Sequence, residues 1–137
     1  MPAPTFLSDA LRLQWQGTKT WFPGAVQNNP VATTVLADTG ALEGGTYLFH
    51  VFSWQDGAAV GHVQVEHRNA ANSAIVTNAN GNADAQRRAI GAGGNDDFVF
   101  GNGIVISTNE RVRVTVVANI TGNVQCGILA VQTVTSP

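Results

Sequence analysis

The chain has 137 residues, 12% of them charged, a formal net charge of −2 and a single cysteine, Cys126. This length suits one domain with its own core, and a lone cysteine excludes an internal disulfide and a cysteine-based zinc cluster. The charge balance lacks the basic surplus typical of nucleic-acid-binding proteins, and no apolar run approaches the ~20 residues that span a bilayer.

The first thirty residues differ from the rest of the chain. Prolines punctuate them, and residues 1–9 lack the basic and long apolar regions of a signal peptide, so we expect the protein to be made in a cytoplasm. We interpret residues 1–30 as an N-terminal arm or long loop that carries one short strand at 11–15. The remaining residues, 31–137, are expected to form a β-sandwich, so that the whole chain is a single domain.

From residue 31 onward, apolar and polar residues alternate, which predicts an all-β fold. Residues 60–68 show the clearest alternation, with Val63, Val65 and His67 on one face. Residues 46–54 are apolar on both faces, which indicates a central strand covered twice, with Trp54 in the core. Shorter candidate strands are residues 31–37, 73–77, 98–100 and 104–108.

The last third of the chain has the strongest hairpin pattern. Residues 110–120 alternate, the run Thr121-Gly122-Asn123 is typical of a tight turn, and residues 124–134 alternate again. Only residues 83–90 fit a short helix, which the glycines that follow would end. About eight antiparallel strands separated by Gly and Asn turns predict a jelly roll or a related β-sandwich.

Residues that could carry chemistry do not cluster. His62 and Glu66 share a strand face but lie about 13 Å apart at ~3.3 Å per residue, too far to bind one metal, and His67 points the opposite way. The pair Asp96-Asp97 fits turn chemistry better than a calcium loop. No nucleophile elbow or phosphate-binding loop is present. The sequence therefore predicts a protein that is not an enzyme and has no catalytic, cofactor-binding or metal-binding residue.

Low charge and loop aromatics favour a protein that docks on other proteins, because interface cores are depleted of charges and enriched in aromatic residues. The candidate interface residues are Phe6, Trp15, Trp21 and Phe22, and the last two are expected in a loop before Pro23. Trp15 could instead complete the domain's own core. Aromatic residues could also line a sugar-binding face, but contact with protein is the favoured interpretation.

Three segments carry a family resemblance. They are Ala-Asp-Thr-Gly-Ala-Leu-x-x-Gly-Thr-Tyr at 37–47, Val-Glu-His-Arg-Asn-Ala-Ala-Asn at 65–72, and Glu-Arg-Val-Arg-Val at 110–114 before the last hairpin. Together, over most of 31–137, they resemble small virion proteins of tailed bacteriophages, of the cement or decoration type. The last hairpin is also similar, more weakly, to the trimeric tumour-necrosis-factor and complement-C1q jelly rolls.

The phage resemblance implies a jelly roll on the capsid surface that clamps major capsid subunits without catalysis or a cofactor. We therefore expect a virion structural protein whose partners are the major capsid protein and itself, as a dimer or trimer, with no nucleic acid and no membrane. The alternative is a carbohydrate- or receptor-binding jelly-roll module of a virion tail or tip. A cupin-like enzyme would need a clustered His/Glu metal set, which the strand geometry disfavours.

Overall fold

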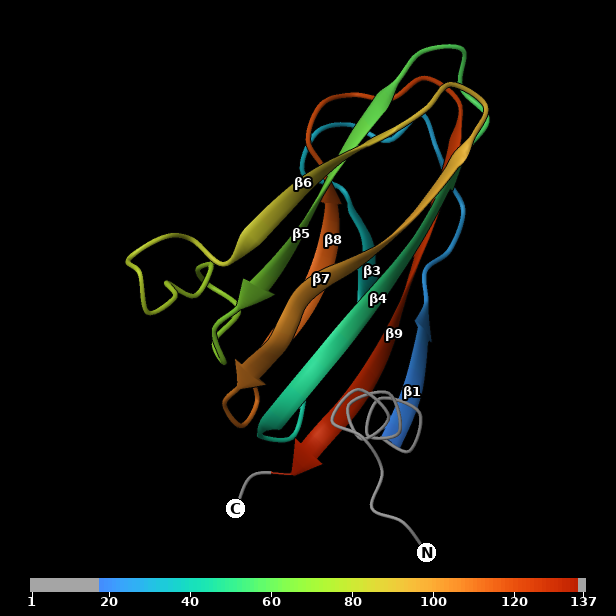
Figure 1. The fold of residues 1–137 in the computed structure, drawn as a ribbon. Helices are drawn as coiled ribbons and strands as arrows, with labels where there is room; N and C mark the ends of the chain where they lie inside the picture. Colours follow the sequence, from blue (N-terminus) through green and yellow to red (C-terminus); the bar gives the residue numbers. More distant parts are fainter. Residues whose placement is uncertain (1–17, 136–137) are drawn as a thin grey trace, which may run out of the picture.

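The computed structural model describes residues 18–135, with side chains for this range apart from 101–102 and 134–135. Within this range nine strands form two antiparallel sheets that lie face to face (Figure 1). The five-stranded sheet has the order β1-β9-β4-β7, with the short β2 paired to β9, and the four-stranded sheet has the order β3-β8-β5-β6. The strands are β1 (Thr18–Pro23), β2 (Gln27–Asn28), β3 (Val35–Asp38), β4 (Gly45–Gln55), β5 (Gly61–Arg68), β6 (Ala85–Ile90), β7 (Asn95–Ile106), β8 (Arg111–Val116) and β9 (Asn123–Thr135).

The core lies between the two sheets and follows the alternation of the sequence. Phe49 of β4, Val63 of β5 and Val114 of β8 are fully buried, because every second residue of a strand points to the same face. The predicted all-β sandwich is confirmed. The inward faces expected for the strands at residues 60–68 and 110–116 are confirmed as well.

The predicted hairpin of residues 110–120 and 124–134 is wrong. β8 pairs with β3 and β5, whereas β9 pairs with β1 and β4, so the chain crosses from one sheet to the other at this turn. A turn sequence specifies that the chain reverses, but it does not specify which strands then pair. Here Asp56, just after β4, accepts hydrogen bonds from the backbone N–H and side-chain amide of Asn123 and so fixes the start of β9 beside β4; these bonds lower the pKa of Asp56.

Residues 83–90 do not form the short helix that the sequence suggested. β6 pairs with β5 from Ala85 to Ile90, and this tertiary pairing overrides the helix propensity of Ala, Gln and Arg. The two short strands expected at 98–100 and 104–108 merge into the single strand β7. The strand expected at 73–77 is reduced to two isolated bridges.

A long loop of residues 69–84 joins β5 to β6 and projects from the side of the sandwich (Figure 1). Asn69 holds its first turn by accepting a hydrogen bond from Ser73 N at 2.9 Å. Asn78 holds the distal turn, where its backbone and side chain bond Gly81 and Asn82. The tip, residues 77–83, is exposed.

The expected N-terminal arm includes residues that the structure places in a sheet. Trp21 and Phe22 lie in β1, paired with β9, and not in the loop that the sequence predicted. Pro23 was the reason to predict a loop there. An edge strand tolerates proline, however, because one of its sides needs no ladder partner. Residues 1–17, with the strand expected at 11–15, lie outside the described residues.

β4 is the central strand that the sequence predicted, but only one of its faces is in the core. Phe49 and Val51 point inward and are fully buried, whereas Trp54 is on the outer face and 40% exposed. The placement of Trp54 in the core is therefore wrong. The outer face of the five-stranded sheet is left partly open to solvent.

Val114→Asp is expected to destabilise the domain by more than about 4 kcal/mol, because it buries an unpaired carboxylate in the core. Val105→Asp is the matched control, since Val105 also lies in a strand but is 71% exposed. Thermal and urea unfolding of both variants measures the difference. Equal melting temperatures for the two variants would contradict the inward orientation of Val114.

Candidate functional site

The outer face of the five-stranded sheet carries aromatic and aliphatic side chains. Trp21 of β1 is 50% exposed, and Trp54 of β4 and Val99 of β7 are exposed as well. Phe52 lies among them: its ring is T-shaped to Trp21 at a centroid distance of 5.5 Å and stacked on His50 at 4.4 Å. Contiguous exposed apolar surface of this kind marks interaction sites in soluble proteins.

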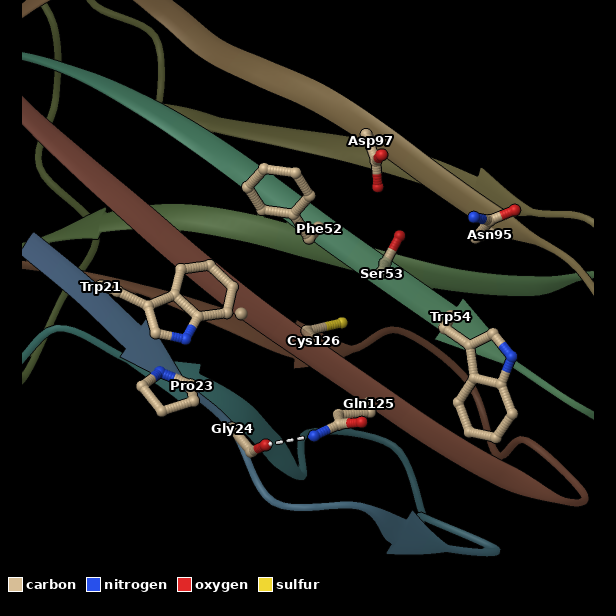
Figure 2. Close-up of a pocket in the computed structure, with 11 residues that line it drawn as sticks. Trp21, Pro23, Gly24, Phe52, Ser53, Trp54, Asn95, Asp97, Gln125 and Cys126 are labelled. Atoms are coloured by element: carbon tan, nitrogen blue, oxygen red, sulfur yellow. Dashed lines mark hydrogen bonds between the residues drawn. The ribbon is translucent and has the colours of Figure 1, made fainter.

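A groove crosses this face between the indoles of Trp21 and Trp54 (Figure 2). Its volume is about 340 Å³. Asn95 and Asp97 of β7 lie along one side, and Gln125 of β9 lies along the other, where its amide donates to Gly24 O at 2.9 Å. The backbone of Asp97 pairs with β4, but its carboxylate makes no hydrogen bond or ion pair with the described residues. The groove therefore combines two aromatic walls with polar groups that are available to a ligand.

Gly127 of β9 shapes one end of the groove. The indole of Trp21 lies directly over it, where a Cβ would overlap the ring. Glycine inside a strand often marks such a close approach, so Gly127 is the residue in the sequence that points to this groove.

The structure describes two of the four residues predicted at an interface. Trp21 is exposed at the groove, but Phe22, its neighbour in β1, turns inward and packs against the core. The two rings therefore lie on opposite faces of the five-stranded sheet and cannot share one contact. Phe6 and Trp15 lie outside the described residues.

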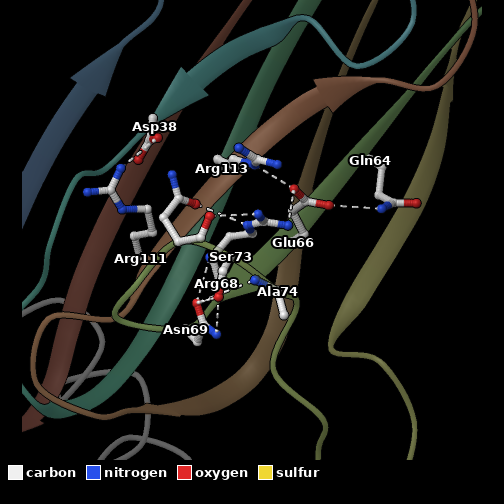
Figure 3. Close-up of polar contacts among 10 residues, drawn as sticks. Asp38, Gln64, Glu66, Arg68, Asn69, Ser73, Ala74, Arg111 and Arg113 are labelled. Atoms are coloured by element: carbon white, nitrogen blue, oxygen red, sulfur yellow. Dashed lines mark hydrogen bonds and ion pairs between the residues drawn. The ribbon is translucent and has the colours of Figure 1, made fainter.

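The outer face of the four-stranded sheet is polar (Figure 3). At its centre Glu66 is only 4% exposed and is surrounded by partners. Arg113 Nε donates to its carboxylate at 2.5 Å, Gln64 Nε2 donates at 3.0 Å, and Arg68 Nη1 lies 3.5 Å away. Breaking such a pair would leave a buried charge without compensation, so these contacts hold β5 and β8 together.

His67 is a structural link between strands. Its Nδ1 lies 2.9 Å from Asp84 Oδ2, just before β6, and its Nε2 lies 2.9 Å from Glu110 Oε1, just before β8. Glu110 also accepts a hydrogen bond from Ser107 N at 2.7 Å. Among residues 18–135, no group of three or more His, Cys, Asp or Glu side chains is arranged to hold a metal ion.

Cys126 lies beneath the groove and is buried. Desolvation raises the pKa of its thiol to about 12, so the nucleophilic thiolate is scarce at neutral pH.

Inside the described range, no helix is long and apolar enough to cross a membrane.

Comparison with known proteins identifies a fold and not a family. No family model matches the sequence, and no curated protein matches it. Among solved structures, the Eiger TNF from S. frugiperda superimposes with a TM-score of 0.58 at 11% identity, covering 88% of this chain and 95% of that one. This likeness shows a jelly-roll sandwich.

Two virus structures also align with this chain. Mud Crab Dicistrovirus gives a TM-score of 0.44 at 10% identity, covering 96% of this chain and 73% of that one. The structure of the infectious bursal disease virus Gx strain gives a TM-score of 0.42 at 12% identity, covering 85% of this chain but 32% of that one. One fold can host many functions, so the function has to be argued from this chain's own surfaces.

Gly127→Ala is expected to push the indole of Trp21 out of its place in the groove, because the exposed ring can move more easily than the backbone below it. The free energy of unfolding should change by less than about 1 kcal/mol. Acrylamide quenching of tryptophan fluorescence measures the displacement. In a Trp21→Ala background, Gly127→Ala should leave the quenching unchanged. Unchanged quenching in the parent background would contradict the packing of Trp21 on Gly127.

Proposed function

We propose that this chain is a structural protein of a virion, located on the capsid surface, where it binds major capsid subunits and copies of itself. The observation that carries the proposal is the apolar outer face of the five-stranded sheet, on a chain with only 12% charged residues. Burying such a face favours association by about 25 cal/mol per Å² of apolar area. The sequence resemblance to cement and decoration proteins supports a capsid as the partner.

The two outer faces support a division of roles. The face with Trp21, Trp54 and Val99 is suited to copies of the same chain, because like apolar faces can meet across the two-fold axis of a dimer, and different parts of the face can meet around the three-fold axis of a trimer. The opposite face, with its ion pairs around Glu66, is suited to a partner of different chemistry. We propose that the segment before β1 adds to the capsid contact through Phe6 and Trp15, as the sequence suggested.

Trp54→Arg is expected to weaken self-association, because it places a charge on the apolar face. Sedimentation velocity should show dimers or trimers for the parent chain and monomers for the variant. Val60→Arg is the control, since Val60 is also exposed but lies in the connection between β4 and β5. Binding to purified capsids should also be weaker for Trp54→Arg than for the parent chain, and Val60→Arg should bind as the parent does. A parent chain that is monomeric in solution and isolated from its copies on the capsid would contradict the proposal.

A second candidate function is binding of carbohydrate, and the groove favours it. Sugar rings pack their C–H faces on aromatic walls such as Trp21 and Trp54, while hydroxyls need polar groups such as Asp97 and Asn95. If this function holds, a glycan array should show saturable binding that Asp97→Ala removes. Val105→Ala, on the same sheet but outside the groove, should bind as the parent does. The capsid proposal predicts no binding above background for any of the three proteins.

A further inference from the structure

The outer face of the four-stranded sheet concentrates the positive charge of the chain. Four of the seven lysine and arginine residues lie on it, against the carboxylates of Asp38 and Glu66. The chain as a whole has a net charge of −2, so this face is opposite in sign to the rest of the molecule. The four residues are Arg68, Arg87, Arg111 and Arg113.

A small hollow opens on this face where β5, β6 and β8 lie side by side. Arg87 and Arg113 line it, with Gln64 and Glu66 between them and Thr115 beside them. Its volume is about 190 Å³. Pockets for small-molecule ligands usually measure roughly 300–1,000 Å³, so this hollow is of a size for one side chain.

The two guanidinium groups at the hollow have donors to spare. Arg87 uses its Nε to bond Gln64 Oε1 at 3.1 Å, and Arg113 uses its Nε to bond Glu66. The Nη atoms of both arginines make no hydrogen bond with the described residues. A guanidinium presents five N–H donors in a planar fork that matches a carboxylate.

Glu66 does not cancel the charge of the hollow. Its buried carboxylate is already engaged by Arg113 and Arg68, so the positive charge of Arg87 has no counterion among the described residues. Three guanidinium groups face one carboxylate. An incoming anion therefore meets a site of net positive charge whose own acidic group lies beneath it.

The backbone beside the hollow is strained. Thr33 also lines it and has a φ of 73°, a conformation that is rare for a β-branched residue. Hydrogen bonds from Thr33 N to Val116 O at 2.8 Å and from Thr34 N to Val31 O at 3.1 Å hold the turn. Strain of this kind clusters at binding sites, which agrees with a role for the hollow.

We propose that this hollow receives an aspartate or glutamate side chain of a protein partner, bound by the Nη groups of Arg87 and Arg113. Arginine is enriched at protein interfaces, and a single-side-chain pocket is typical of an anchor residue there. A nucleic acid would need a longer track of cations than this face provides. The inference rests on the proposed function only for the partner's identity, a capsid subunit.

The test titrates the full chain with N-acetyl-glutamate amide, and with N-acetyl-glutamine amide as its neutral counterpart, while NMR follows the arginine side chains. We expect saturable shifts at Arg87 and Arg113 with the glutamate probe only, weaker at high salt. Arg87→Gln should weaken binding about tenfold or more, and Arg87→Lys should recover part of it. Arg111→Gln, on the same face but outside the hollow, is the matched control.

Two results would overturn the proposal: no saturable shift with the glutamate probe, whether or not inorganic phosphate binds, or equal shifts with the glutamine probe. Binding of Arg87→Gln to purified capsids then tests the partner. If the probe binds the parent but Arg87→Gln decorates capsids fully, the hollow binds a carboxylate as proposed, but the capsid is not its partner. If the parent binds the probe but no capsid, only the proposed function fails.

Discussion

The pairing of β4 with β9 holds both the core and the groove in place. The two strands pair antiparallel from Gly45 to Gln55, with a register shift between Thr46 and Tyr47 and an unbroken register from Tyr47 onward. This register sends Phe49 and Val51 inward and leaves Phe52 and Trp54 outside. A slip of one residue would exchange the two sets, and because one face is packed in the core, such a slip is strongly disfavoured. The outer face that carries the groove is therefore specified by the same contacts that make the domain stable.

The two sheets share one core but differ in what they show to solvent. The five-stranded sheet exposes indoles and aliphatic side chains, and the four-stranded sheet exposes a network of ion pairs around Glu66. Apolar surface favours contact that is broad and weakly directional, whereas guanidinium groups favour a partner with a carboxylate in one geometry. The two faces of this small domain therefore differ in the chemistry of the contact that each could make.

Sequence alternation predicted the strands that are half-buried, because their period of two is a local property. β5 and β8 were found with their inward faces correct. Which strands pair is not local, and the hairpin expected after β8 failed for that reason. The groove could not be predicted from the sequence either, because it is formed by residues of three strands that are far apart in the chain: Trp21, Trp54 and Gln125. Trp21 was singled out as exposed, but for a loop that turned out to be an edge strand.

The loop between β5 and β6 has a consequence for protein engineering. Its base is fixed by His67, which reaches Asp84 at the far end of the loop, while residues 77–83 at its tip are exposed and pack on neither sheet. Exposed tips anchored at their base tolerate inserted sequence, because the added chain disturbs no buried group. The loop leaves the sandwich on the side away from the groove strand β1 (Figure 1). A foreign epitope grafted between Asn78 and Gly81 would thus be displayed clear of the aromatic groove, and the domain becomes a compact carrier for an inserted peptide.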